Sequence, residues 1–189
     1  MEIRLTNLEP NRIYHIFNRG INGCETYRTK ENYFFFLRKT QLFLSPYFEI
    51  YAYCLMKNHF HFLLMPKPLI HADDAFKFEE GLHSKQGFHS NQLGKLISSY
   101  TQAFNKVFKR HGPLFESPFK RIEVKTEAHL FRALIYIHNN SRVIGIHPSK
   151  YAYCSYSEII DEQQKIANKS SLKWFGGKDN FIFCHNKKQ

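Results

Sequence analysis

A two-residue break between two strand-like runs constrains the fold of this chain more than any other feature. Residues 48–56 and 59–65 are rich in aromatic and aliphatic types, and only Lys57 and Asn58 separate them. So short a connection joins neighbouring strands as a tight antiparallel hairpin, because a parallel crossover needs a dozen or more residues. The sequence therefore predicts an antiparallel sheet built around this hairpin.

Further strand and helix patterns flank the hairpin. Aromatic and β-branched runs that end at glycine or polar residues indicate strands, and apolar residues at spacings of three and four indicate amphipathic helices. Strands are predicted at 12–19 and 119–124, and helices at 29–43, 91–110 and 126–139. The resulting order, βαββαβα, favours an α+β fold in which helices pack on one face of a ferredoxin-like or RRM-like antiparallel sheet.

The length of 189 residues fits one domain. We expect that domain to span residues 1–160. A stretch at about 66–91 lacks steady periodicity and is predicted to be a long loop or flap, because ordered elements of that length show a regular apolar pattern. Residues 161–189 are predicted to form a C-terminal tail that is at best partly ordered.

The charge balance points to a polyanionic partner. Lys and Arg number 27 against 16 Asp and Glu, which gives a formal net charge of +11. Nucleic acid is the leading interpretation and an anionic membrane surface the second. No run approaches 18 apolar residues, the first residues lack a signal-peptide pattern, and the four cysteines form no Cys-x-x-Cys pair. We therefore expect a soluble, cytoplasmic protein with reduced cysteines and no membrane partner.

Two histidines in the second strand of the hairpin suggest a site. His59 and His61 are two residues apart, so both imidazoles lie on one face of the strand. Neighbouring imidazoles can hold one metal ion. A chance His-x-His pair on a half-exposed sheet is the alternative, since the chain has 11 histidines.

The residues around this pair resemble a known signature. The segment from Tyr51 to Leu64, YAYCLMKNHFHFLL, resembles that of the HUH-type single-tyrosine transposases, which act on single-stranded DNA. Residues 14–20 (YHIFNRG), 112–121 (GPLFESPFKR) and 136–140 (YIHNN) are similar to the branch called REP-associated tyrosine transposases. The resemblance spans roughly residues 12–157 and leaves the C-terminal tail unassigned.

This resemblance implies a nucleophile and a ligand set. By motif position, Tyr136 is the catalytic tyrosine, and Asn140 joins His59 and His61 as the third metal ligand. Helix geometry agrees independently, because residues four apart lie on one helical face. Asn139 is the reserve ligand, since Ser141 and Arg142 follow Asn140 where the family continues with Asn-Pro.

The resemblance also implies the chemistry. A divalent metal, Mg²⁺ or Mn²⁺, would polarise the scissile phosphate, although imidazole ligands alone suit zinc, nickel or cobalt equally well. The implied enzyme nicks and rejoins single-stranded DNA next to hairpins through a 5′-phosphotyrosine intermediate. It needs no nucleotide cofactor, and a homodimer is possible. The predicted DNA contacts are five polar residues around the proposed site, all within the segments quoted above: Arg19, Lys57, Asn58, Lys120 and Arg121.

Other function classes fit part of this pattern. An RRM-like module that binds RNA or single-stranded DNA without catalysis matches the charge but leaves the spacing of Tyr136 and Asn140 unexplained. A small metallohydrolase would use the two histidines with Glu116 or Glu123 to activate water. A catalytically silent transposase relative that only binds hairpins is the third alternative.

Overall fold

The computed structural model describes residues 6–69, 87–161 and 166–186. The predicted hairpin is present: β2 (Phe48–Met56) pairs antiparallel with β3 (His59–Pro66), and Met56 lies opposite His59. The loop after β1 fixes the two-residue turn, because the N–H groups of Thr26 and Tyr27 donate to the carbonyl of Lys57 at 2.9 and 3.1 Å.

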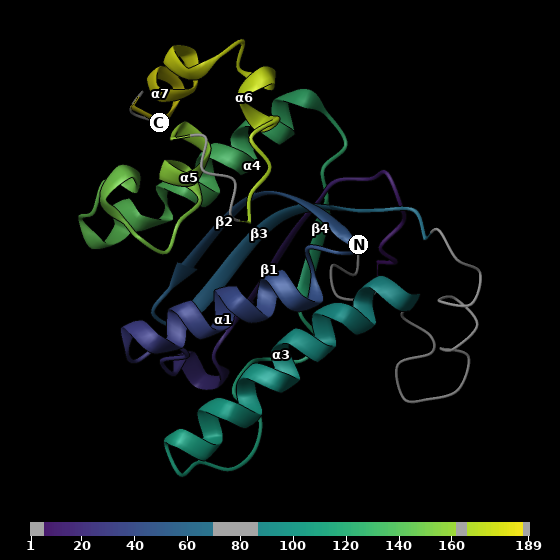
Figure 1. Cartoon of the computed structure of the whole chain (residues 1–189), viewed down its shortest axis with the longest axis vertical. Helices are drawn as coiled ribbons and strands as arrows, with labels where there is room; N and C mark the ends of the chain where they lie inside the picture. Colours follow the sequence, from purple (N-terminus) through teal and green to yellow (C-terminus); the bar gives the residue numbers. More distant parts are fainter. Residues whose placement is uncertain (1–5, 70–86, 162–165, 187–189) are drawn as a thin grey trace.

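The sheet has four strands in the order β2-β3-β1-β4 (Figure 1). β1 (Tyr14–Arg19) pairs antiparallel with β3 on one side and with β4 (Lys120–Glu123) on the other. The predicted α+β fold with an antiparallel sheet is therefore confirmed.

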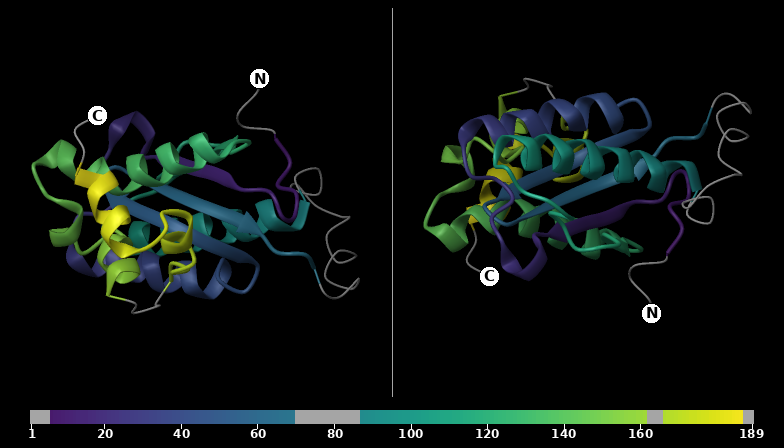
Figure 2. Two further views of the ribbon diagram at one scale, coloured as in Figure 1. Left: turned by 90° about the horizontal axis from the view of Figure 1, so that it is seen from above. Right: turned by 90° about the horizontal axis from the view of Figure 1, so that it is seen from below.

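Two helices cover one face of this sheet. α1 (Lys30–Phe43) and α3 (Gly87–Val107) lie side by side there (Figures 1 and 2). Phe36 of α1 packs against Phe60 of β3 at a ring-centroid distance of 5.3 Å and against Tyr100 of α3 at 5.0 Å. Burial of such rings contributes about 2 kcal/mol each, so this layer forms the main hydrophobic core.

α4 (Glu127–Asn139) lies on the opposite face. It begins at Thr126, whose Oγ1 accepts a hydrogen bond from the N–H of His129 at 3.2 Å. Its apolar residues Leu134 and Ile137 are fully buried, and the helix contacts β2 and β3. The prediction that helices pack on one face thus holds for α1 and α3, while α4 covers the face that carries the histidine pair.

Residues 166–186 contradict the prediction of a C-terminal tail that is at best partly ordered. They include α6 (Ser171–Trp174) and α7 (Lys178–Asn186), and α7 packs on α4. Phe175, Phe181 and His185 are 4%, 0% and 1% exposed. The sequence did not reveal these helices, because each is too short to show a sustained amphipathic pattern.

Shorter helices connect the larger elements: η1 (Ile21–Gly23), η3 (Asn140–Ile144), η4 (Pro148–Lys150) and α5 (Tyr156–Ile160). The flap predicted at about 66–91 falls mostly outside the described residues, and its last residues belong to α3. None of the helices within the described ranges is long and apolar enough to cross a membrane.

Candidate active site

Strand register gathers the histidine pair and two cations on one face of the sheet. His59 lies opposite Arg19, and His61 lies opposite Phe17, which in turn pairs with Lys120 on its other side. Side chains of directly opposed residues point to the same face. Residues from three strands thus converge on the face that α4 covers.

A pocket of about 200 Å³ opens at this point. It is lined by residues of three strands, one loop and α4: Phe17, Asn18, Arg19, His59, His61, Glu116, Lys120 and Tyr136. Five of the predicted site residues therefore line one pocket: Arg19, His59, His61 and Lys120 come from the sheet, and Tyr136 faces them from α4.

Tyr136 differs from its helical neighbours. Leu134 and Ile137 are fully buried, whereas Tyr136 is 50% exposed. Its ring stands edge-on to His61, with centroids 5.5 Å apart and an interplanar angle of 83°. An ordinary core aromatic would be buried, so the exposure of this tyrosine beside the histidines favours a functional role.

Asn140 lies at the C-terminal end of α4, one turn beyond Tyr136. Its Nδ2 donates to the carbonyl of Tyr136 at 2.8 Å, and its side chain is hydrogen-bonded to His59. The reserve ligand Asn139 is committed elsewhere, because its Nδ2 donates to the carbonyl of His185 at 3.4 Å and its Oδ1 accepts from Arg142 at 2.9 Å. The geometry therefore favours Asn140 over Asn139.

Each histidine has a partner at Nδ1. Nδ1 of His59 lies 2.7 Å from Oδ1 of Asn58, and Nδ1 of His61 lies 2.8 Å from Nε2 of His15. His15 was missed by the sequence reasoning. Its alternation with Phe17 and Arg19 already put it on their face of the strand, but its distance from His61 depends on the β1–β3 register.

Burial keeps these imidazoles neutral. Desolvation, reinforced by the neighbouring His15 and His59, lowers the pKa of His61 to about 2. Desolvation, with a smaller contribution from His129, lowers the pKa of His15 to about 4. The pKa of His59 is also lowered by burial, and the hydrogen bond with Asn140 opposes that change. Neutral imidazole is the form that binds metal ions.

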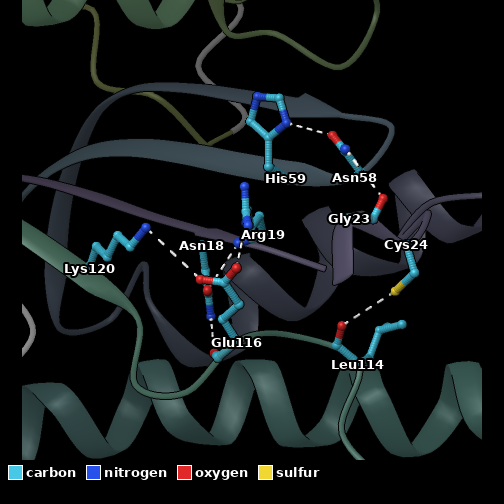
Figure 3. Close-up of polar contacts among 9 residues, drawn as sticks. All are labelled: Asn18, Arg19, Gly23, Cys24, Asn58, His59, Leu114, Glu116 and Lys120. Carbon is cyan, nitrogen blue, oxygen red and sulfur yellow. Dashed lines mark hydrogen bonds and ion pairs between the residues drawn. The ribbon is translucent and has the colours of Figure 1, made fainter. Parts of the chain in front are cut away.

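The cations at the pocket share one carboxylate (Figure 3). Glu116 forms ion pairs with Arg19 and with Lys120, the latter at 3.9 Å. Asn18 holds the Glu116 loop against β1, because its Nδ2 donates to the Glu116 carbonyl at 2.8 Å. The proposed water-activating role of Glu123 lacks such a position, since Glu123 lies opposite Tyr14 at the other end of β1 and pairs with Arg12 at 2.9 Å.

The other predicted DNA contacts lie elsewhere. Lys57 is exposed at the hairpin turn and pairs with Glu25 at 2.7 Å. Arg121 is only 1% exposed, because its side chain points to the α3 face, where Nη1 donates to Oγ of Ser90 at 2.8 Å. The prediction that Arg121 contacts DNA is therefore wrong: neighbouring strand residues alternate between faces, and Lys120 takes the pocket side.

Two imidazoles and one amide oxygen are the groups at this site that could hold a divalent metal. Across the described part of the chain, no group of three or more His, Cys, Asp or Glu side chains is arranged to hold a metal ion. Two neutral imidazoles and the carbonyl oxygen of an amide are nevertheless available in His59, His61 and Asn140. Such a set leaves coordination positions open for a substrate oxygen.

Comparisons with known proteins bear on the fold. No protein-family model matches the sequence, and no curated protein matches it significantly. Among solved structures, a bacterial tRNA(His) guanylyltransferase-like protein is similar in its GTP complex (TM-score 0.45, 7% identity, 74% of this chain and 67% of that chain) and in its ATP complex (TM-score 0.43, 7% identity, 86% and 76%). These two similarities are too weak to support an assignment.

A third solved structure is more similar. It is a REP-associated tyrosine transposase bound to a REP hairpin, with a TM-score of 0.62 and 13% identity, and the similarity covers 87% of this chain and 88% of that chain. The resemblance read from the sequence is thereby confirmed at the level of the fold. The chain has the fold of a REP-associated tyrosine transposase.

Proposed function

We propose that this protein is a metal-dependent tyrosine transposase that nicks and rejoins single-stranded DNA next to hairpins. The observation that carries the proposal is the exposed Tyr136, which stands edge-on to His61 in the same pocket as His59. The shared fold with a transposase bound to a REP hairpin supports hairpin DNA as the partner.

In this proposal His59, His61 and Asn140 hold a divalent ion, Mg²⁺ or Mn²⁺. Bound there, the ion would withdraw electron density from a scissile phosphate and stabilise the charge that develops on its oxygens. The neutral histidines and the carbonyl oxygen of the Asn140 amide fit this role, since Nδ2 of that amide donates to the Tyr136 carbonyl and its side chain lies at hydrogen-bonding distance of His59.

Tyr136 supplies the nucleophile. Its Oη attacks phosphorus and forms a phosphotyrosine at the DNA 5′ end, while the bond from phosphorus to the 3′ oxygen breaks. The phenolic proton leaves to solvent, and the departing 3′ oxygen takes up a proton to become a hydroxyl. Because the phosphodiester is conserved as a tyrosyl ester, a 3′-hydroxyl can attack it later and restore the DNA strand.

Arg19 and Lys120 are the proposed phosphate-binding cations. Both pair with Glu116 in the free protein, so an incoming phosphate replaces a carboxylate rather than water as their partner. The two ion pairs with Glu116 keep the cations oriented before DNA binds. The net charge of +11 favours association with a polyanion in general.

A covalent adduct tests the proposal directly. Purified protein is incubated with a labelled single-stranded hairpin pool and Mn²⁺, and denaturing gels reveal DNA that remains attached to protein. We expect an adduct with the wild type, and none with Tyr136→Phe or after chelation of the metal. Tyr153→Phe is the matched control, because Tyr153 is a partly exposed tyrosine that stacks on Tyr33 of α1, away from the pocket.

The alternatives predict different outcomes. A metallohydrolase would still cleave DNA after Tyr136→Phe, without an adduct. A binding module or silent relative would bind hairpins tightly and give no adduct with any of them. A homodimer and a cytoplasmic location stay predictions.

A further inference from the structure

The orientation of Asn58 determines which nitrogen of His59 carries a proton. Nδ2 of Asn58 donates to the carbonyl of Gly23 at 3.4 Å, so its Oδ1 faces Nδ1 of His59 at 2.7 Å (Figure 3). An amide oxygen can only accept a hydrogen bond. Nδ1 of His59 must therefore be the donor, and in a neutral ring Nε2 then presents a lone pair.

The loop that orients Asn58 is itself held in place. The N–H of Gly20 donates to the carbonyl of Asn58 at 2.7 Å, and the N–H of Gly23 donates to the carbonyl of Gly20 at 3.0 Å. A Cβ at Gly20 would lie 2.2 Å from the carbonyl oxygen of Cys24, so only glycine permits this close approach. The carbonyl that orients Asn58 is thus part of a tightly bonded turn.

His61 has an equivalent partner on the other side of the pocket. Nε2 of His15 lies 2.8 Å from Nδ1 of His61, and one proton lies between them. His15 is 9% exposed and packs tilted against Phe17 and edge-on against Tyr136, at centroid distances of 4.9 and 6.0 Å. With that proton on His61, the Nε2 lone pair of His61 also becomes available.

We propose that Asn58 and His15 are positioning residues that hold His59 and His61 in the Nδ1-protonated tautomer, with both Nε2 lone pairs available to a divalent cation. The hydrogen bond at one imidazole nitrogen sets the tautomer of the ring and thereby the nitrogen left for a ligand. The cation as ligand rests on the proposed function, whereas the tautomers are properties of the metal-free protein. Asn58 therefore acts on the histidine, while its predicted contact with DNA stays a prediction.

Nuclear magnetic resonance of the metal-free protein tests the tautomers. Long-range ¹H–¹⁵N correlation spectra at neutral pH distinguish Nδ1-protonated from Nε2-protonated rings, and His59→Gln and His61→Gln assign the signals. We expect Nδ1 protonation for both histidines, with a shift toward Nε2 protonation of His59 in Asn58→Leu and of His61 in His15→Leu. Nε2 protonation of either ring in the wild type would overturn its part of the inference.

Calorimetric titration with Mn²⁺ tests the consequence for binding. Asn58→Leu and His15→Leu should each weaken Mn²⁺ binding by about 10- to 100-fold. Asn58→Asp keeps the acceptor oxygen, and His15→Gln offers an amide oxygen in place of the imidazole nitrogen, so both variants should recover most of the affinity. His111→Leu removes an exposed histidine and serves as the control.

The outcomes separate this inference from the proposed function. Wild-type Mn²⁺ affinity in both leucine variants, with folding verified by circular dichroism, would overturn the positioning role. Absence of Mn²⁺ binding in the wild type would instead contradict the proposed function, while the spectra of the metal-free protein would still decide the tautomers.

Discussion

Two pairs of hydrogen-bonded histidines lie in this protein and differ in what surrounds them. His15 and His61 meet at 2.8 Å beside the pocket, and His138 and His185 meet at 2.9 Å between α4 and α7. In the second pair every ring nitrogen has a protein partner, because Nε2 of His138 also bonds to Oγ of Ser155 at 2.8 Å and Nδ1 of His185 donates to the Phe181 carbonyl at 2.7 Å.

The polarity of this second network follows from its ends. The Phe181 carbonyl can only accept, so His185 donates from Nδ1 and accepts at Nε2 from Nδ1 of His138. His138 then accepts at Nε2 from Ser155. A buried histidine whose two ring nitrogens both have protein partners thus joins elements of the fold, whereas His61 beside the pocket has one ring nitrogen left for a ligand.

Removing one histidine from each pair should give the largest effects, on Mn²⁺ affinity for His61 and on stability for His138. His61→Ala should weaken Mn²⁺ binding at least about 100-fold, since it removes a proposed ligand, and should lower stability by only about 1 kcal/mol because water can enter the open pocket. His138→Ala should lower the free energy of unfolding by about 3 kcal/mol, since it leaves a cavity and unpaired groups on Ser155 and His185.

Chemical denaturation and Mn²⁺ titration of both variants check this pair of expectations. The distinction between the two histidine pairs breaks down if His138→Ala loses Mn²⁺ affinity while its folded state is retained, or if His61→Ala unfolds as readily as His138→Ala.

Acidification should weaken the His138–His185 pair next. Burial lowers the pKa of His185 to about 4, with Arg142 and His147 adding to the decrease and the Phe181 carbonyl opposing it. Since the unfolded chain binds the proton near pH 6.5, the stabilisation is complete above that pH and is lost as the pH falls toward 4. With a pKa near 6.5 in the unfolded chain and of about 4 in the folded protein, His185 should contribute about 3 kcal/mol to the loss of unfolding free energy in acid.

Denaturant unfolding measured from pH 7.5 to pH 4 tests this dependence. His185→Gln keeps an acceptor for His138 but removes the titrating ring, so its unfolding free energy should fall less steeply with acid. His111→Gln, an exposed substitution, should retain the wild-type slope. An unchanged slope in His185→Gln would argue that this pair does not titrate on unfolding.

The smallest expected effect on stability comes from Arg142, which bonds to the C-terminal end of α7. Nη2 of Arg142 donates to the His185 carbonyl at 3.2 Å and to Oδ1 of Asn186 at 3.0 Å. Because Arg142 is exposed, Arg142→Ala should lower the free energy of unfolding by about 1 kcal/mol. Arg132→Ala, another exposed arginine of this region, is the control, and equal losses in both variants would assign the effect to charge alone.

The sequence by itself determined the hairpin, the main helices and the grouping of several candidate site residues. The two-residue turn and the alternation of the flanking strands fixed the hairpin and put His59 and His61 on one face, because these are local properties of a strand. The helical spacing of four likewise put Tyr136, in the last turn of α4, on the same side as Asn140, the residue that caps this helix. No long-range information is needed for such relations.

Only the tertiary structure decided which residues meet. Register between β1 and β3 brings His15 to His61, and strand alternation turns Lys120 to the pocket and Arg121 into the α3 face. The burial of α7 on α4 depends on contacts between residues far apart in the sequence, such as His138 and His185, which are 47 positions apart. These contacts are distant in sequence, so neither periodicity nor motif spacing encodes them.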